Sequence, residues 1–277
     1  MTDSAVPSVR QPQAQETDVP GAARLAELAA ELTELLRLRT LAIGLKLFED
    51  VEEMLAIPRL RRPGEGKRFT ACQLVTHARM AGLTLGIVQD NLRANSNCDG
   101  VIGLGTPGED YLSGQRMNGV WFENQEAARD HQAGMTRVAP GRYRGLVAAP
   151  LRAARLDPPD VVMFYATPGQ MILFINGLQW KSYRRYDFTV TGETACSDSW
   201  GRALATRQTS LSIPCYAERR YGGVADEELL MALPPEEFER GIAGLRGLSK
   251  AGLRYPIPPY GPFADPSEGM EKSYGGD

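Results

Sequence analysis

The chain has 277 residues, 43% of them hydrophobic, which is enough to bury a substantial core and argues against a disordered protein. The formal net charge is −3 and no segment is dominated by Lys and Arg, which argues against a nucleic-acid partner bound by phosphate neutralisation. The N-terminus lacks the basic and apolar regions of a secretory signal, and no apolar run reaches about 18 residues. We therefore expect a cytoplasmic protein with no membrane partner.

The first third of the chain alternates helical and strand patterns after a polar lead. Residues 1–20 are rich in Pro and Gln and lack periodicity, which is typical of a disordered segment. Residues 22–38 place leucines at three- and four-residue spacings and predict an amphipathic helix. The elements expected next are a strand over 41–48, a short helical turn over 50–56, a helix over 69–81 and a strand over 83–88.

Residues 90–111 differ from their surroundings in being rich in Asn, Gly, Asp and Pro. They contain Gly100-Val-Ile-Gly-Leu-Gly105, whose order is wrong for a nucleotide-binding glycine loop and which we expect to be a flexible turn. A long irregular segment inside a compact domain is more often functional than idle. We therefore expect a functional role for this stretch.

The second half of the chain carries the clearer signals for regular structure. Residues 160–166 form an apolar run typical of a buried strand. Thr167 is a natural N-cap and Pro168 suits the first helical position, so a helix is expected over 170–180. The remaining expected elements are helices over 123–135 and 234–248 and strands over 143–150, 186–190, 210–213 and 227–233.

Helices and strands follow one another without a regular βαβ order, which favours an α+β fold over a doubly wound sheet. No internal repeat and no central linker divides the sequence. We expect a disordered lead over 1–20, a single mixed α+β domain over 21–248 and an extended, irregular tail over 249–277.

Four cysteines, Cys72, Cys98, Cys196 and Cys215, are the candidates for a working site. They form no Cys-x-x-Cys pair, so their spacing is weak support for a metal, and a buried free cysteine is often a small hydrophobic residue. Their settings differ from core positions. Cys98 and Cys196 lie in polar turn sequences, Cys215 ends a strand, and Cys72 begins a helix whose free N–H groups favour a thiolate. In a reducing compartment such thiols stay available for metals or chemistry.

Several segments of the chain resemble those of a known family. They are Thr70–Gln73, Asn97–Gly100, Pro159–Pro168, Ala195–Asp198, Ser212–Cys215 with Arg219–Gly223, and Ala225–Pro234 before an acidic helix. In this order, over roughly residues 22–247, they are similar to domain of unknown function family 169. Members of that family carry a cysteine at each of the four places, which implies that the thiols act together. The resemblance implies no established activity, and the chain departs from the usual Cys-x-Gly-Gly by having Cys98-Asp-Gly-Val101.

Four soft thiolates suit an iron–sulfur cluster or zinc. Zinc sites usually recruit close cysteine pairs, so we favour a cluster of the 4Fe–4S type, held by Cys72, Cys98, Cys196 and Cys215. Ligation by all four cysteines would suit electron transfer or a structural role. Ligation by three would leave one iron open to a substrate as a Lewis acid, with Cys72 as the expected non-ligand.

Other residues near these segments are candidates for catalysis or substrate binding. His77 lies on the same predicted helix as Cys72 and is either a structural histidine or a proton-transfer group. Asp198 is a candidate base or partner of a ligand. Arg219 and Arg220 can grip a carboxylate with two hydrogen bonds, so we expect a small anionic organic substrate.

The leading hypothesis is an iron–sulfur enzyme that acts on a small organic anion, either as an oxidoreductase or by Lewis-acid chemistry of the lyase or hydratase type. Two alternatives stay open. One is a non-catalytic, cysteine-lined ligand-binding or electron-transfer subunit that serves a redox partner protein. The other is a structural protein stapled by zinc, which chelation would unfold. The sequence carries no decisive signature for or against a bound flavin.

Overall fold

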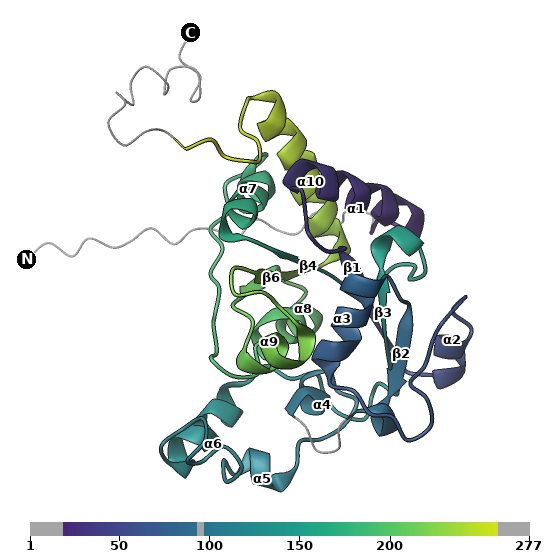
Figure 1. Ribbon diagram of the computed structural model, residues 1–277, viewed down its shortest axis with the longest axis vertical. Coiled ribbons are helices and arrows are strands. Elements are labelled where there is room, and N and C mark those ends of the chain that lie inside the picture. The colour runs from purple at the N-terminus through teal and green to yellow at the C-terminus, as the bar shows by residue number, and fades with distance from the viewer. Residues whose placement is uncertain (1–18, 93–96, 260–277) are drawn as a thin grey trace, which may run out of the picture.

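The computed structural model describes residues 19–92 and 97–259, and within these ranges the chain has an α+β fold built on one sheet (Figure 1). The sheet has six strands in the order β2-β3-β1-β4-β6-β5, and all neighbouring strands are antiparallel. The strands are β1 (Ile43–Phe48), β2 (Leu85–Val88), β3 (Gly145–Pro150), β4 (Val161–Ala166), β5 (Ser210–Ser212) and β6 (Leu229–Leu233). The α+β class expected from the sequence is confirmed.

The centre of the sheet is buried on both faces, which explains the apolar run of β4. Every residue of β4 is buried, and the strand lies between β1 and β6. Alternate side chains of such a strand point to opposite faces, so both faces must be covered by other elements. Met163 and Tyr165 belong to one hydrophobic cluster, whereas Val162 and Phe164 belong to the other.

One face of the sheet is covered by α1 (Ala22–Leu36), α7 (Pro168–Gln179) and α10 (Pro235–Lys250), which gather at the top of Figure 1. The leucine stripe of α1 is buried here, as its spacing predicted. Helices α7 and α10 pack with their backbones in close approach. A Cβ atom at Gly244 would lie 1.9 Å from the carbonyl oxygen of Gly177, so only glycine fits at this crossing.

The opposite face is covered by shorter helices, and it carries the four cysteines. These helices are α3 (Ala71–Ala81), α4 (Asn97–Val101), one π-helical turn η3 (Ser197–Gly201), α8 (Arg202–Thr206) and α9 (Tyr216–Gly222). Trp200 on η3 is almost fully buried in the cluster on this face. A third, smaller cluster lies under α2 (Val51–Leu55) and includes Met54 and Val147.

Helices α5 (Glu109–Leu112) and α6 (Gln125–Gly134) form the projection at the lower left of Figure 1. Single 3-10 turns, η1 (Gln89–Asn91) and η2 (Leu151–Ala153), follow β2 and β3. No helix among residues 19–92 and 97–259 has both the length and the apolar composition that a bilayer crossing needs.

Most elements match their expected positions within a few residues, and three differences are informative. The expected strand over 186–190 is wrong, because this segment has no strand partner. Aromatic and polar residues alternate over Tyr186–Thr189 because one side of the segment is packed. On that side Tyr186 packs against the cluster of α1, α7 and α10, and its ring stacks with Phe188. The expected irregular stretch 90–111 contains the short helices α4 and α5, and α9 was not foreseen. The lead expected over 1–20 lies almost wholly outside the described residues, as do residues 260–277 of the expected tail.

Candidate functional site

The four cysteines, which are separated by up to 143 positions in sequence, line one cavity of about 480 Å³. Each cysteine stands at or near the start of a helical element. Cys72 lies in the first turn of α3, Cys98 in α4, Cys196 directly before η3 and Cys215 directly before α9. All four are free thiols, and all but Cys98 are buried. The fold thus brings together the four residues that the sequence marked as one site.

Helices α3 and α9 are joined at the level of Cys72. Thr70 caps α3 by accepting a hydrogen bond from the backbone N–H of Gln73 (3.2 Å), while the Gln73 side chain accepts one from the N–H of Thr70 (3.0 Å). One turn later, the Thr76 hydroxyl lies 2.9 Å from the carbonyl oxygen of Cys72 and 2.7 Å from that of Gly222 on α9. This contact fixes Cys72 next to the helix that Cys215 begins.

A second close approach brings Cys98 and Cys196 together. A Cβ atom at Gly201 would lie 2.5 Å from Cγ1 of Val101 and 2.8 Å from the carbonyl oxygen of Cys196. The absence of a side chain at Gly201 therefore lets η3 pack directly on α4. As a result, the Sγ atoms of Cys98 and Cys196 are only 3.9 Å apart.

Cys215 is tied to a buried polar network behind the cavity. Glu218 accepts a hydrogen bond from the backbone N–H of Cys215 (3.3 Å) through Oε2, and from the hydroxyl of Tyr165 (3.0 Å) through Oε1. The Arg79 guanidinium lies 4.2 Å from the centre of the Tyr165 ring and pairs with Glu228 at 3.2 Å. This chain of contacts runs from the sheet to the cavity and holds Cys215 in place.

The thiols form a hydrogen-bonded group that favours negative charge at one sulfur. The thiols of Cys196 and Cys72 donate to the Cys98 sulfur and hold the pKa of Cys98 well below its ordinary value. The same interaction raises the pKa values of Cys72 and Cys196 well above theirs. Burial raises the pKa of Cys215 to about 11. Within the group, negative charge is therefore favoured at Cys98 and disfavoured at Cys72 and Cys196.

Two carboxyl groups line the same cavity. Burial raises the pKa of Glu193 and the pKa of Glu218 to about 7 each. Each can therefore exchange a proton near neutral pH, as a general acid or base must. Neither residue was foreseen. Glu218 could have been found from its position three residues after the helix-starting Cys215, which is the spacing of a capping box. Glu193 gives no comparable signal.

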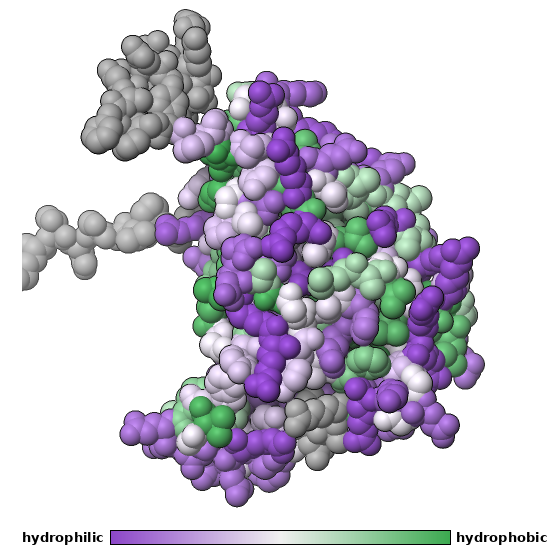
Figure 2. Space-filling model, in the orientation of Figure 1, coloured by the Kyte–Doolittle hydropathy of each residue, from purple (hydrophilic) through white to green (hydrophobic). Residues whose placement is uncertain are grey.

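Among the described residues, the mouth of the cavity is aromatic and carries one cation. Trp121 meets Tyr216 edge to face with ring centres 5.4 Å apart, and Tyr111 and Tyr221 line the same cavity. Arg220 donates a hydrogen bond to the Tyr216 hydroxyl at 3.2 Å. Trp121, Tyr216 and Tyr221 are exposed, so they offer ring surface to a ligand. Figure 2 shows one small apolar patch on the α5–α6 projection, which is otherwise largely polar. Val120, in the segment between these two helices, is 72% exposed.

The other residues proposed from the sequence are placed differently. Arg220 lines the cavity, whereas Arg219, His77 and Asp198 do not belong to its lining. Arg219 donates to the carbonyl oxygen of Ala225 at 2.6 Å. The His77 ring meets the Phe69 ring edge to face. Asp198 is buried on η3, where its backbone carbonyl accepts from a serine hydroxyl. Catalytic roles for His77, Asp198 and Arg219 stay predictions from the sequence.

The thiols do not converge on one point. Within the described residues, no three His, Cys, Asp or Glu side chains are arranged to hold a single metal ion. The sulfurs of Cys98 and Cys196 have the spacing of two ligands of one ion, because two thiolates on a tetrahedral ion at about 2.3 Å lie about 3.8 Å apart. The four thiols thus line a cavity without converging on a single point.

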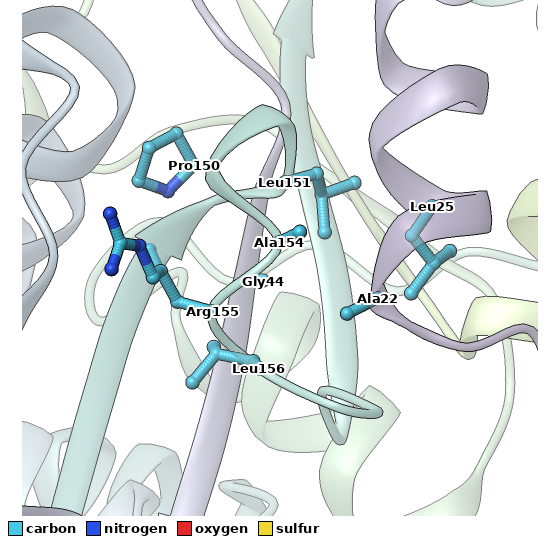
Figure 3. A pocket seen from close by; sticks show the side chains of 9 residues that line it. Ala22, Leu25, Gly44, Pro150, Leu151, Ala154, Arg155 and Leu156 are labelled. Carbon is cyan, nitrogen blue, oxygen red and sulfur yellow. The ribbon is translucent and has the colours of Figure 1, made fainter. Parts of the chain in front are cut away.

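A second hollow, at the start of α1, offers no chemistry. Its volume of about 10 Å³ holds at most one water molecule, and its lining is almost entirely apolar. Arg155, the one charged residue among the described residues of this lining, points away from Ala22 and Leu25 (Figure 3). Its guanidinium donates instead to the carbonyl oxygen of Pro58 at 2.9 Å. This hollow is a packing gap, and the cysteine-lined cavity is the better candidate site.

Comparison with known proteins connects the chain to one family. Residues 31–244 match the DUF169 family model, described as "Uncharacterised ArCR". The uncharacterised protein MJ0308 of Methanocaldococcus jannaschii is 23% identical over 218 residues, which cover 78% of this chain and 91% of that protein. No solved structure matches the chain significantly. The family match spans more than half of the chain and contains all four cysteines, so the chain belongs to the DUF169 family.

Proposed function

We propose that this member of the DUF169 family holds an iron–sulfur cluster on its cysteines and acts on a small organic anion in the adjoining cavity. The observation that supports this most is the convergence of four thiols, from four separate segments, on one cavity. Soft thiolate donors select iron–sulfur clusters or zinc among the biological metals. Free cysteines in a hydrophobic core usually pack among apolar side chains. These four instead line an open cavity together with two carboxyl groups and an arginine.

Cys98, Cys196 and Cys215 are the ligands that we assign first. Cys98 already favours the thiolate, which is the form that binds a metal. Cys72 donates to Cys98 and completes the lining of the cavity. It is a fourth ligand if all irons are capped, and a free thiol beside the substrate if one iron is open. When bound, a cluster with an open iron supplies a Lewis acid, and a fully capped cluster supplies electron transfer.

The side chains of the cavity supply the remaining chemistry. Arg220 at the mouth attracts and orients the anionic end of a substrate. The aromatic wall of Trp121 and Tyr216 restricts access of water and offers a flat contact surface. Glu193 and Glu218 each hold or release a proton near pH 7. Proton transfer to or from a bound substrate is the step that these groups suit best.

Zinc is the second candidate, and one distance favours it. The separation of 3.9 Å between the sulfurs of Cys98 and Cys196 is that of two thiolates on one tetrahedral ion. A zinc site with four cysteines would be closed and structural, so it would leave the adjoining cavity without a metal-dependent role. Zinc bound at this place would also make folding depend on the metal.

The test is anaerobic purification followed by assays for iron, zinc and acid-labile sulfide and a visible spectrum. We expect a coloured protein with equal amounts of iron and sulfide. Cys98→Ser and Cys196→Ser should lose most of both, whereas Ile213→Ala, an exposed change near Cys215, should retain them. The iron and sulfide content of Cys72→Ser then distinguishes ligation by three cysteines, which the variant retains, from ligation by four, which it loses. A folded, colourless protein without iron would overturn the proposal, and one zinc per chain would favour the second candidate.

A further inference from the structure

Helix α9 turns one face toward the cavity, and this face carries two aromatic rings and a cation. Its members all line the cavity, and they are Tyr216, Ala217, Arg220 and Tyr221. At about 100° per residue, these four positions lie within an arc of about 140° of the helix. Arg219 lies outside this arc and donates to the carbonyl oxygen of Ala225 instead. The four residues therefore form one surface, which we call the α9 face.

Arg220 is positioned by the two rings of the α9 face. Its guanidinium carbon lies 6.0 Å from the centre of the Tyr216 ring and 5.9 Å from that of the Tyr221 ring, and it donates to the Tyr216 hydroxyl at 3.2 Å. Among the described residues, Arg220 pairs with no carboxylate. The residue is exposed, and a guanidinium has five N–H donors in a planar fork. Arg220 can therefore bind the carboxylate of a ligand through two hydrogen bonds.

The rings at the mouth are accessible to a ligand. Trp121, from the segment between α5 and α6, meets Tyr216 edge to face, and the two residues are 45% and 53% exposed. Tyr221 is 42% exposed. Aromatic rings that are open to a cavity bind another ring by offset stacking or edge contacts. Ala217 lies among them on α9 and has only a methyl group, so it leaves room beside the rings.

We infer that the cavity binds an aromatic carboxylate whose acid group is attached directly to the ring. Because the two tyrosine rings are equally close to the guanidinium of Arg220, a ligand ring in contact with either one brings a carboxylate on its own edge within reach of that cation. An acid on a flexible chain would lose more conformational entropy to make both contacts at once. In naming this ligand the substrate, the inference rests on the proposed function.

The test compares three probes, titrated by calorimetry into the anaerobically purified full chain. Benzoate has both the flat ring and the charge, cyclohexanecarboxylate has the charge without a flat ring, and benzamide has the flat ring without the charge. Benzoate should bind about fivefold to tenfold more tightly than cyclohexanecarboxylate, because only a flat ring stacks. It should bind at least about tenfold more tightly than benzamide, because only a carboxylate makes two charge-assisted hydrogen bonds to Arg220.

Two variants separate the ring contact from the charge contact. Trp121→Leu should bring the affinities for benzoate and cyclohexanecarboxylate to within about twofold of each other, while both acids still bind. Arg220→Gln should do the same for benzoate and benzamide. Arg129→Gln is the matched control for the second variant, because Arg129 is an exposed arginine on α6 outside the cavity lining, and it should keep both preferences.

A third variant tests the place of binding. Ala217→Leu fills the space beside the rings and should weaken benzoate binding at least about tenfold. Ala205→Leu is the same change at an exposed position of α8 outside the lining, and it should bind benzoate normally.

Equal affinity for the three probes, or no binding of benzoate, would overturn the inference, as would unchanged preferences in Trp121→Leu and Arg220→Gln. These outcomes are independent of the metal assays. A protein with iron and sulfide that shows no preference for benzoate refutes the ligand class alone. A metal-free protein that shows both preferences refutes the cluster alone.

Discussion

The buried ion pair behind the cavity allows a sharp test of the fold, because the chain contains its own control. Arg79 forms an ion pair with Glu228, and these two side chains are 1% and 5% exposed. Arg39 pairs with the neighbouring Glu227, and these side chains are 62% and 54% exposed. The substitutions Glu228→Gln and Glu227→Gln are therefore the same chemical change at adjacent positions, one buried and one in solvent.

The expected magnitudes follow from these environments. Glu228→Gln leaves the Arg79 cation buried without a counter-ion, and breaking a buried pair from one side costs about 3–5 kcal/mol. Arg79 retains its hydrogen bond to the carbonyl oxygen of Gly223 and its position over the Tyr165 ring, so we expect the lower end of that range. Glu227→Gln should cost less than about 1 kcal/mol, because exposed ion pairs contribute little.

The assay is equilibrium unfolding in urea at pH 7, followed by far-ultraviolet circular dichroism. The double variant Arg79→Met/Glu228→Leu should be less destabilised than the sum of its single variants, since it leaves no unpaired charge. Equal losses for Glu227→Gln and Glu228→Gln, or a loss below about 1 kcal/mol for the latter, would refute the reasoning. Either result would mean that Arg79 does not depend on Glu228 for its burial.

Two further predictions concern packing and pH. Gly244→Ala should lower the free energy of unfolding by about 3 kcal/mol or more, because the added Cβ meets the Gly177 backbone, which cannot move aside; urea unfolding measures the loss. Gly134→Ala should leave the free energy of unfolding unchanged, because the space around its added Cβ is open. Equal losses of stability for the two variants would disprove the close crossing of α7 and α10. Burial raises the pKa of Asp160, so the folded chain holds this proton to higher pH than the unfolded chain does. Stability should therefore fall as pH rises from about 4 toward that raised pKa. Asp160→Asn should remove this fall, while its amide oxygen can still accept from the N–H of Leu47. If the free energy of unfolding of the wild type instead rises relative to that of the variant as pH rises, the assignment is contradicted.

Much of the fold could be predicted because its signals are local. The N-cap Thr167 and Pro168 define the start of α7, and a continuous apolar run defines β4. Helix α9 was missed because a cysteine occupies its N-cap in place of the usual serine, threonine or aspartate. The segment 186–190 was misread because alternation reports one buried side and carries no information on whether a neighbouring strand is present.

For the candidate site, too, local sequence predicts some features, whereas others depend on tertiary structure. The polar settings of Cys98 and Cys196 marked them as unlike core residues, but no local pattern fixes their distance. That distance depends on Gly201, which lets η3 pack against α4. The role of Arg220 rather than Arg219 also depends on tertiary structure, because α9 turns one side chain toward the cavity and the other toward Ala225. Convergence of distant residues requires the sheet and its helices to be in place.

The most direct test of the central claim is native mass spectrometry of the anaerobically prepared full chain. The mass added to the bare polypeptide identifies what the cysteines hold. Our account predicts the added mass of an iron–sulfur cluster, with four irons and four sulfides, and its loss in Cys98→Ser/Cys196→Ser. A folded wild-type chain with no added mass, or with the mass of a single zinc ion, would contradict the claim.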